Sequence, residues 1–446
     1  MPDNKVSRVR WALVFLLLLL SAVAFLDRVN ISIAGSSIAQ AYGLSNTQLG
    51  YVFSAFLAGY SLFQTVGGRL ADQLGSRRVL AGGVLWWGLF TALSAIVPTG
   101  IGHAVFILLC IRFLLGAGEA VVYPASNQFV AQWIPPQERG VANGIIFAGV
   151  GVGAGLSPPL ITFVMLHYGW RMSFWVCATI GIVAGSIWFL AARDTPEKHP
   201  LVSPSELDHI RKGLPRPVSG STLNLVASNP VASKEALVPW AKVLQSKDVW
   251  AVTVSYFCYG YVAWIFFSWF YIYLATIRGL NLKASAFYAM LPFLAMAVAC
   301  PLGGILSDRL TISHGPRLGR CGLAGISIGL AAIFLILGSH AASARLASVV
   351  LAGGAGALYL AQSSFWSVAA GLAGSSSGSV SGFMNMGAQL GGMTTASLTP
   401  IIAAHFGWTA SFLVAAGLCG LGAILWMAVN PENCLTTPLQ RPQEMD

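Results

Sequence analysis

Four ionisable residues stand inside apolar stretches that are long enough to cross a membrane. Asp27 and Arg28 are neighbours in the run from Trp11 to Gly35, and Arg112 and Glu119 lie seven residues apart in another apolar run. An ionisable side chain at membrane depth is costly unless it is paired or hydrated, so such residues usually mark an ion or substrate pathway. The alternative is two inert ion pairs between helices, but apolar replacements of such pairs are often neutral or stabilising. A functional role is therefore favoured.

The chemistry of these side chains favours anion binding coupled to proton transfer. Arg28 carries a permanently charged planar guanidinium that matches a carboxylate, so we expect it to bind an anionic substrate. Asp27 points about 100° away from Arg28 on a helix. We expect Asp27 to carry the proton, because an anion that occupies Arg28 would weaken the stabilisation of the Asp27 charge. Glu119 is a second expected proton site, with Arg112 as its partner about 10 Å away along the same helix face.

Composition places these residues in a membrane protein. The chain has 446 residues, of which 56% are hydrophobic and 9% are charged, whereas soluble domains carry about 25% charged residues. The seven cysteines are scattered and no CxxC spacing occurs, so we expect neither a metal site nor disulfides. The net charge of +10 does not predict nucleic-acid binding, because the basic residues alternate with apolar spans as topology requires.

The apolar stretches predict an all-α integral membrane protein with 12 transmembrane helices. About twenty apolar residues cross a bilayer. The spans are expected near residues 10–32, 47–70, 79–98, 102–125, 142–165, 170–192, 248–276, 284–307, 318–339, 345–368, 378–402 and 408–429. A polar, Pro- and Ser-rich segment separates the sixth span from the seventh. The expected organisation is an N-terminal six-helix bundle (1–193), a linker (194–247), a C-terminal six-helix bundle (248–430) and a tail (431–446).

The distribution of lysine and arginine predicts the orientation. Most of these residues fall at the N-terminus, in the linker and in alternate loops, and few fall in the remaining loops. By the positive-inside rule, both termini and the linker are expected to be cytoplasmic. We expect a multi-pass protein of a bacterial inner membrane.

The two halves of the chain repeat each other. HYGWRMSF (167–174) returns as HFGWTASF (405–412), and GVANG (140–144) is matched at the same offset by GSVSG (378–382). GRLADQLGSRR has a looser counterpart in GILSDRL (304–310). Repeats at nearly one offset indicate two pseudo-repeat bundles of six helices, which is typical of transporters with a site between the halves.

The segment GGRLADQLGSRRVL (67–80), which follows the second span, resembles the signature loop of the major facilitator superfamily. LDRVNIS (26–32) and RFLLGAGEA (112–120), followed by YPASNQFVAQWIPPQERGVANGI (123–145), are similar to the anion:cation symporter family within it. That family contains sugar-acid, phthalate and vesicular anion carriers. The fifth span, GVGVGAGLSPP (149–159), has no Gly-Pro dipeptide, so the antiporter signature of drug exporters is missing.

The resemblance implies a binding site for a hydroxylated anion. It assigns substrate contacts to Arg28, to Tyr60 in the second span, and to Ser363 (or the adjacent Ser364), Trp366 and Asn385 in the second half. It also implies the proton-coupling roles given above for Asp27, Glu119 and Arg112. Val150 is a departure, because sugar-acid carriers tend to have a glutamine there.

Three residues after the second span are implied to form an inner gate. Asp72, Arg77 and Arg78 are expected to make ion pairs when the carrier opens outward. Asp308 and Arg309 are the weaker equivalents in the second half of the chain. The alternative is that these charges serve the positive-inside topology alone.

These observations together predict a secondary active transporter. The favoured function is import of a sugar acid (aldonate, uronate or aldarate) by proton symport and alternating access. An uncoupled carrier, an exchanger or an exporter of other organic anions, such as aromatic anions or dicarboxylates, is the alternative. No sequence motif supports a membrane enzyme or a sensor. The expected partners are a small organic anion, protons and the lipid bilayer, without a cofactor, and the expected state is a monomer.

Overall fold

The computed structural model describes residues 7–44, 46–99, 103–213, 237–270, 273–280 and 282–435. Every regular element within these ranges is a helix. The first half of the chain contains α1 (Val9–Tyr42), α2 (Asn46–Leu74), α3 (Ser76–Ile96), α4 (Ala104–Glu119), α5 (Val122–Trp133), the short η1 (Pro136–Glu138), α6 (Arg139–Tyr168) and α7 (Trp170–Ala191).

The linker and the second half are helical as well. The linker contains η2 (Pro196–Lys198), α8 (Pro204–Gly213) and α9 (Trp240–Gln245). The second half contains α10 (Lys247–Ser268), η3 (Tyr273–Ile277), α12 (Leu282–His314), η4 (Arg317–Gly322), α13 (Leu323–Ser339), α14 (Ala344–Leu360), α15 (Gln362–Ala373), η5 (Gly374–Ser376) and α16 (Ser377–Ala428).

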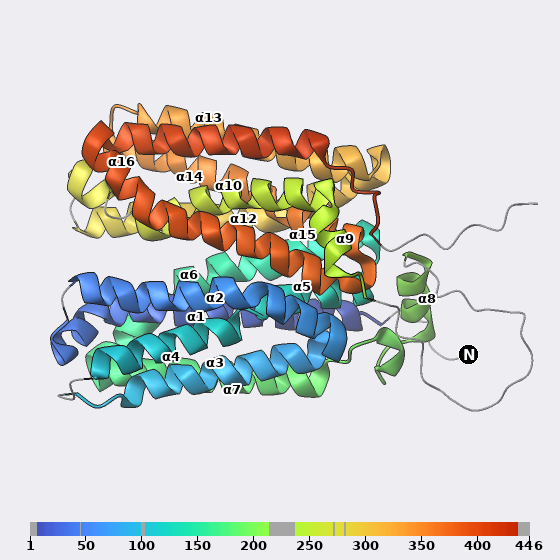
Figure 1. The fold of residues 1–446 in the computed structure, drawn as a ribbon, viewed down its shortest axis with the longest axis horizontal. Helices are drawn as coiled ribbons and strands as arrows, with labels where there is room; N and C mark the ends of the chain where they lie inside the picture. Colours follow the sequence, from blue (N-terminus) through green and yellow to red (C-terminus); the bar gives the residue numbers. More distant parts are fainter. Residues whose placement is uncertain are drawn as a thin grey trace, which may run out of the picture.

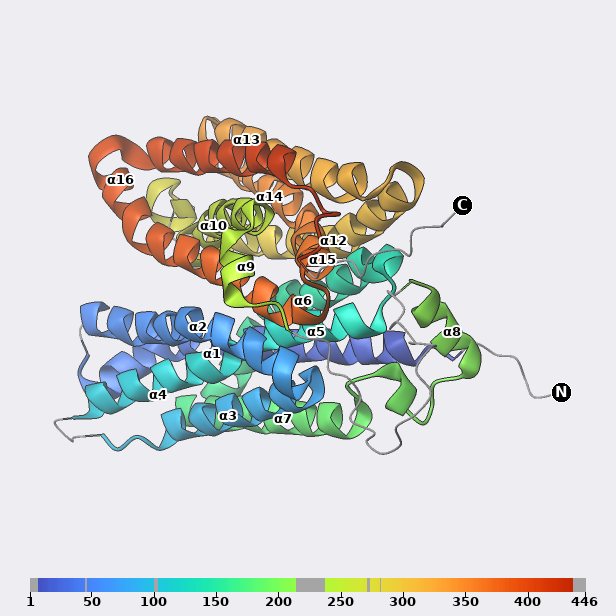
Figure 2. The ribbon, with the colours of Figure 1, turned by 45° about the vertical axis from the view of Figure 1, so that its right-hand side comes forward.

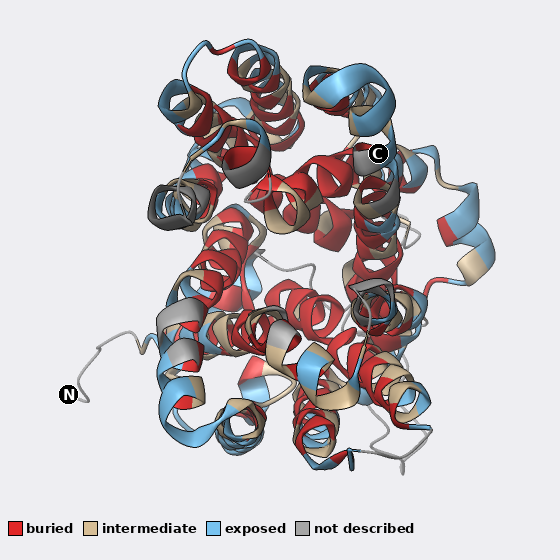
Figure 3. Cartoon of the chain, turned by 90° about the vertical axis from the view of Figure 1, so that its left-hand side faces the viewer, coloured by how far each residue is buried: buried red, intermediate tan, exposed pale blue. Residues whose placement is uncertain are grey.

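The membrane character predicted from composition is confirmed. Ten helical stretches in the described ranges are long and apolar enough to cross a bilayer. Two of them consist of a helix pair each, α4 with α5 and α14 with α15. The two remaining expected spans coincide with α2 and the first part of α16. Buried residues lie on the inward helix faces, and exposed residues lie on the outer faces (Figure 3). Large apolar side chains on the outer faces, such as Phe106, Leu166 and Met427, therefore face lipid.

The sequence repeat corresponds to a repeat in backbone conformation. Gly169 ends α6 with φ 80° and ψ 163°. Gly407 interrupts α16 with φ 83° and ψ 163°. Both glycines occupy a positive-φ conformation that other residues adopt at a cost, so the same helix-to-helix corner is built twice, and α16 comprises two helices joined at Gly407.

The helices form two bundles that pack together through two helix pairs, α2 with α16 and α6 with α12 (Figure 1). Glycines allow close approach in both pairs. A Cβ atom on Gly68 would lie 2.0 Å from the Gly378 carbonyl oxygen, and one on Gly304 would lie 2.2 Å from the Gly140 carbonyl oxygen. The bundles touch at the end that carries α8 and the start of α1, here called the linker end, and their ribbons diverge toward the opposite end (Figure 2).

Candidate functional site

Two of the four charged residues predicted from the sequence meet between α1 and α4. The Arg28 Nε donates to Glu119 Oε1 at 2.5 Å, and both side chains are buried. Glu119 is the last residue of α4, where the chain turns through Ala120 and Val121 before α5 begins. The Glu119 carboxylate reaches Arg28 of α1 from this end of α4. A buried arginine–carboxylate pair is therefore the centre of the site.

In this conformation Glu119 forms its ion pair with Arg28 and not with its expected partner Arg112. Arg112 lies two turns earlier on α4, about 10 Å away along the helix, and its guanidinium carbon lies 5.0 Å from the centre of the Phe56 ring. Arg28 lies 5.5 Å from the same ring and 4.3 Å from the Tyr60 ring. The Nε and Nη1 atoms of buried Arg112 have no hydrogen-bond partner among the described residues. Arg112 is thus a cation that lies over the Phe56 ring and is attracted electrostatically by Asp27 and, more weakly, by Glu119.

Asp27 lies apart from its sequence neighbour, as helix geometry predicts. Its Oδ2 accepts a hydrogen bond from the Thr91 hydroxyl at 2.8 Å. Its Oδ1 has no hydrogen-bond partner within the described ranges, and the side chain is buried. Asp27 therefore has an oxygen free to take up a proton.

A small cavity lies between the two bundles, with Arg28 in its wall. Its volume is about 60 Å³, which is room for about two waters. The N-terminal bundle contributes Phe25, Arg28, Tyr123, Phe147 and Val150, and the C-terminal bundle contributes mainly tyrosines and amides: Tyr256, Tyr259, Tyr359, Gln362, Asn385 and Gln389. The cavity is one-sided in charge, because among its described lining residues Arg28 alone carries a formal charge.

Four of the five expected substrate residues were assigned by resemblance alone, and the structure separates them. Asn385 lines the cavity, and its amide donates to Gln64 Oε1 at 2.9 Å. Tyr60 packs against Arg28 and is fully buried. Trp366 lies behind the wall, donating to the Tyr256 hydroxyl at 2.9 Å. Ser363 does not line the cavity, because its hydroxyl donates to the Cys300 carbonyl oxygen at 3.3 Å.

Sequence reasoning missed most of the C-terminal wall. Several polar atoms on it are buried and have no hydrogen-bond partner among the described residues, namely the Tyr259 hydroxyl, Gln362 Oε1 and Gln389 Oε1. Arg28 Nη2 is likewise unpartnered. Buried polar atoms are normally paired, so these are the atoms available to a ligand. The sequence did contain a signal for this wall. Six cavity-lining residues of α10 follow helical spacing, which predicts that they share one helix face: Tyr256, Tyr259, Gly260, Ala263, Trp264 and Phe267.

The segments expected to form an inner gate are in contact across the two bundles, but not through ion pairs. The Asp72 carboxylate accepts hydrogen bonds from the backbone N–H groups of Gly378 and Ser379, at 2.9 and 2.7 Å. The Asp308 carboxylate accepts from the N–H groups of Gly140 and Val141, at 2.9 and 2.7 Å. The first N–H groups of a helix lack intrahelical partners and carry partial positive charge. Each carboxylate therefore caps a helix of the opposite bundle.

The arginines expected at the gate do not take part in these contacts. Arg77 bonds within its own bundle, its backbone N–H to Asp194 Oδ1 at 2.9 Å and its Nε to the Phe189 carbonyl oxygen at 2.8 Å. Arg78 and Arg309 are exposed. Helix capping takes the place of the expected ion pairs, because the starts of α6 and α16 lie directly opposite the two aspartates.

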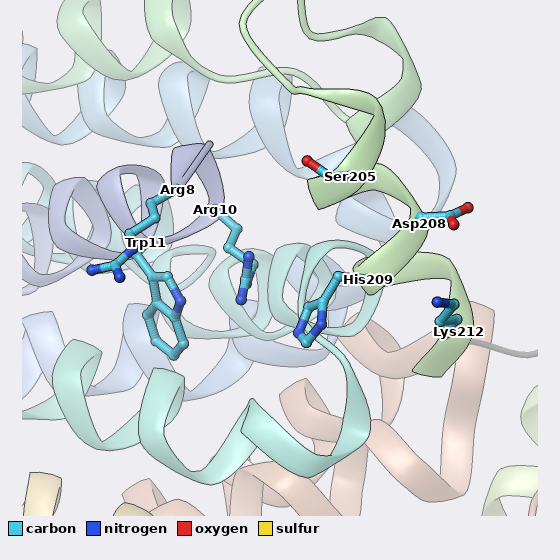
Figure 4. Close-up of a pocket in the computed structure, with 7 residues that line it drawn as sticks. All are labelled: Arg8, Arg10, Trp11, Ser205, Asp208, His209 and Lys212. Atoms are coloured by element: carbon cyan, nitrogen blue, oxygen red, sulfur yellow. The ribbon is translucent and has the colours of Figure 1, made fainter. Parts of the chain in front are cut away.

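A second cavity, of about 610 Å³, lies at the linker end between α8 and the start of α1 (Figure 4). Arg10, which lines it, bonds to Glu206 and Glu138, each at 3.1 Å. His209 also bonds to Glu138, at 2.7 Å. These contacts attach the linker helix to the N-terminal bundle, and the cavity lies outside the interface that holds Arg28.

The comparisons with known proteins agree with this architecture. The family model described as Major Facilitator Superfamily matches residues 17–394. The chain belongs to this superfamily. It is a membrane transporter and not an enzyme.

The similar proteins include transporters named for organic anions. A probable sulfoacetate transporter, SauU, of Cupriavidus necator is 31% identical over 95% of this chain and 94% of its own length. A probable galactarate/D-glucarate transporter, GudP, of Bacillus subtilis is 33% identical over 69% of this chain and 67% of its own. The relatives thus belong to the anion:cation symporter family that the sequence resembles.

Solved structures share the fold. The proton:xylose symporter XylE, bound to 6-bromo-6-deoxy-D-glucose, aligns with a TM-score of 0.72 at 16% identity. The alignment covers 96% of this chain and 97% of the symporter. At this identity the likeness concerns the fold alone, and it confirms the major facilitator fold that the resemblance of the signature loop implies.

Proposed function

We propose that this protein imports an organic anion by proton symport, and that the anion is a sugar acid such as an aldonate, uronate or aldarate. It is a secondary transporter whose relatives carry anions by name. The observation that carries the proposal is the Arg28–Glu119 pair in the wall of the central cavity. Arg28 is the cation to which an anion in this cavity would bind, and a carboxylate of the protein already occupies it.

Competition for Arg28 couples the anion to the proton. A substrate carboxylate that binds Arg28 displaces Glu119, which is fully buried. A buried carboxylate without a partner is strongly disfavoured in its charged form, so Glu119 takes up a proton. Binding of the anion and uptake of the proton then favour each other, which is the thermodynamic requirement for symport.

Asp27 supplies the second proton site. Its Oδ1 has no hydrogen-bond partner among the described residues and its Oδ2 accepts from Thr91, so Asp27 makes no hydrogen bond to the Arg28–Glu119 pair. Arg112 has donors without hydrogen-bond partners among the described residues and is attracted electrostatically by both carboxylates, so its interactions respond to the protonation of either one. Asp27 and Glu119 together give the protein two groups that change charge during transport.

Alternating access follows from the two capping contacts. With Asp72 and Asp308 bound to the opposite bundle, the linker end is closed. Opening this end breaks both contacts at once, because the repeat places them at equivalent positions. The excess of lysine and arginine assigns the linker end to the cytoplasm, in the inner membrane of a bacterium. The anion then enters from the opposite side and leaves at the linker end.

The polar atoms of the C-terminal wall favour a hydroxylated substrate. The Tyr259 hydroxyl and the oxygens of Gln362 and Gln389 lack partners in the described ranges, and they would bond to substrate hydroxyl groups. The tyrosine rings offer flat surfaces to the apolar face of a sugar chain. Arg28 fixes one carboxylate on the other side of the cavity.

A second candidate substrate is a small anion of two or three carbons, such as a short sulfonate. Two observations favour it. The cavity of about 60 Å³ is far below the roughly 300 Å³ of a typical ligand pocket, and Val150 stands where the resemblance leads us to expect an amide. A sulfonate would bind Arg28 by the same charge-assisted hydrogen bonds.

The test is proton flux into proteoliposomes that contain a pH-sensitive dye. The panel contains aldonates, uronates, aldarates, sulfoacetate, phthalate and neutral sugars. Acidification with sugar acids that is lost in Asp27→Asn supports the proposal, and acidification with sulfoacetate alone supports the second candidate. Exchange of a labelled anion without any acidification would reject proton coupling.

A further inference from the structure

An aromatic layer closes the central cavity toward the linker end. Tyr123 stacks on Phe147 with ring centres 4.8 Å apart, and Phe147 lies 5.0 Å from Trp366. Tyr123 and Phe147 belong to the N-terminal bundle, and Trp366 belongs to the C-terminal bundle. The layer therefore crosses the interface that must open for a substrate to leave.

The register of α5 and α6 identifies what lies beneath this layer. The two helices run in opposite directions, with Tyr123 packed on Phe147. Two turns further along α5, the Ala131 carbonyl oxygen accepts a hydrogen bond from Arg139 Nη2 at 2.9 Å. Halfway between these two contacts, one helical turn from each, Asn127 of α5 lies level with Asn143 of α6. Two residues with amide side chains thus lie at the same level, one turn closer to the linker end than the aromatic layer.

One of the two amides, that of Asn127, has no hydrogen-bond partner among the described residues. Asn127 is 1% exposed, and neither its Oδ1 nor its Nδ2 has a hydrogen-bond partner among the described residues. The Asn143 amide donates across the interface to the Ser367 hydroxyl at 3.4 Å, a long contact. In contrast, the buried Ser126 hydroxyl on the same helix donates to the Val122 carbonyl oxygen at 2.7 Å. A buried amide without partners is disfavoured, so its presence at the interface calls for a ligand.

Two buried arginines follow in the next layer. Arg139 donates to the carbonyl oxygens of Ile134 and Ala131. Arg320 donates across the interface to the Pro136 carbonyl oxygen and, within its own bundle, to that of Ser367. Both arginines are bound to neutral carbonyls, and Arg320 Nε has no partner in the described ranges. The nearby carboxylate of Asp308 is occupied by the backbone of Gly140 and Val141.

We propose that Asn127, Asn143, Arg139 and Arg320 form a second anion-binding site, on the route from the central cavity to the linker end. Its ligand is the carboxylate or sulfonate group of the transported anion, so the inference rests on the proposed function. When the bundles part at the linker end, Arg320 loses the Pro136 carbonyl and its donors become available. Amide and guanidinium groups then receive the anion as it leaves Arg28.

The first test measures anion uptake by Asn127→Leu and Asn143→Leu in proteoliposomes. If these residues form an exit site, kcat for uptake falls at least tenfold, which corresponds to about 1.4 kcal/mol. The dissociation constant of the anion, measured from the outer side, stays within about twofold of that of the unmodified protein. Ser126→Ala is the matched control, since it removes a buried hydroxyl from the same helix. An unchanged kcat in both leucine variants, with thermal stability equal to or above that of the unmodified protein, overturns the inference.

The second test needs no transport. Ser367, which is fully buried in the closed state, is replaced by cysteine in a protein whose exposed Cys110 and Cys434 are serine. Thiol reagents of equal size, one anionic and one cationic, are applied to the linker end. We expect the anionic reagent to react at least tenfold faster, which corresponds to about 1.4 kcal/mol, and the preference to disappear with Arg320→Gln or with Asn143→Leu.

Equal rates for the two reagents, or a preference that survives both substitutions, overturn the second site. This outcome leaves the proposed function intact, because proton-driven uptake is measured separately. Conversely, a preserved anion preference in a protein that moves no proton with any anion rejects the proposed function and keeps the second site.

Discussion

Replacement of Glu119 by glutamine separates anion binding from proton coupling. Glu119 holds Arg28 through a buried ion pair at 2.5 Å, and a substrate must break this contact to bind. A hydrogen bond that involves a charged group contributes about 1.5–3 kcal/mol. Because 1.4 kcal/mol corresponds to a factor of ten in affinity, we expect Glu119→Gln to bind the anion about ten- to a hundredfold more tightly. Few substitutions in a binding site increase affinity, so an increase in the affinity for the anion would by itself support the competition for Arg28.

The pH dependence of binding provides a second readout of the same variant. In the unmodified protein, protonation of Glu119 releases Arg28, so the affinity for the anion rises as the pH falls. A glutamine cannot titrate, so this contribution to the pH dependence should be lost in the variant. Isothermal titration in detergent at several pH values measures both effects. Uptake into proteoliposomes should no longer respond to a pH gradient, although exchange of bound anion continues.

A matched control distinguishes this effect from a general change of charge. Glu197→Gln removes a carboxylate from the exposed pair with Arg211, whose closest atoms are 3.4 Å apart. Exposed pairs contribute at most about 1 kcal/mol to stability, and this one lies in the linker. We expect unchanged binding and uptake. Weaker anion binding in Glu119→Gln, or accumulation that still follows the pH gradient, would show that competition for Arg28 is not the coupling step.

Three further substitutions test other parts of the mechanism. Asp27→Asn should abolish accumulation driven by a pH gradient while labelled-anion exchange persists; preserved accumulation would remove Asp27 from the coupling mechanism. Arg28→Ala should lower anion affinity by more than about thirtyfold, since truncating one side of a buried charged contact costs about 2–5 kcal/mol, and an unchanged dissociation constant would refute its role. Gly68→Ala should prevent closure of the linker end and stop uptake, because its Cβ would lie 2.0 Å from the Gly378 carbonyl oxygen. Gly82→Ala is the control, since its Cβ meets nothing within 4 Å, and equal uptake by both variants would contradict the role given to the α2–α16 contact.

Much of the fold could be predicted from local patterns. Apolar runs of about twenty residues identify spanning helices, because backbone groups in a bilayer must be satisfied within the segment. The repeated segments around Gly169 and Gly407 predicted two equivalent halves, and their backbone angles agree to within 3° in φ. Such features depend on the composition of one segment at a time, so they can be predicted without knowing which other helices pack against that segment.

The candidate site was only partly predictable. Rare charges in apolar spans identified Asp27, Arg28, Arg112 and Glu119, because a buried charge is costly wherever it lies. Their pairing was not predictable, since it depends on how α1 packs against α4. The tyrosines of α10 were missed for a related reason: an aromatic stripe at helical spacing looks the same whether it faces a core or a cavity.

The sequence by itself determined that this protein is a membrane transporter of two repeated helical bundles with charged residues in the first bundle. Tertiary structure alone decided which charges meet, which helix ends the gate aspartates cap and which amides are left without partners. The physical reason is that burial and periodicity are properties of single segments, whereas hydrogen bonds reach only about 3 Å. Whether Asp308 meets Gly140 depends on how the bundles pack, and whether Asn127 lies level with Asn143 depends on how two helices of one bundle pack; both kinds of packing belong to the whole chain.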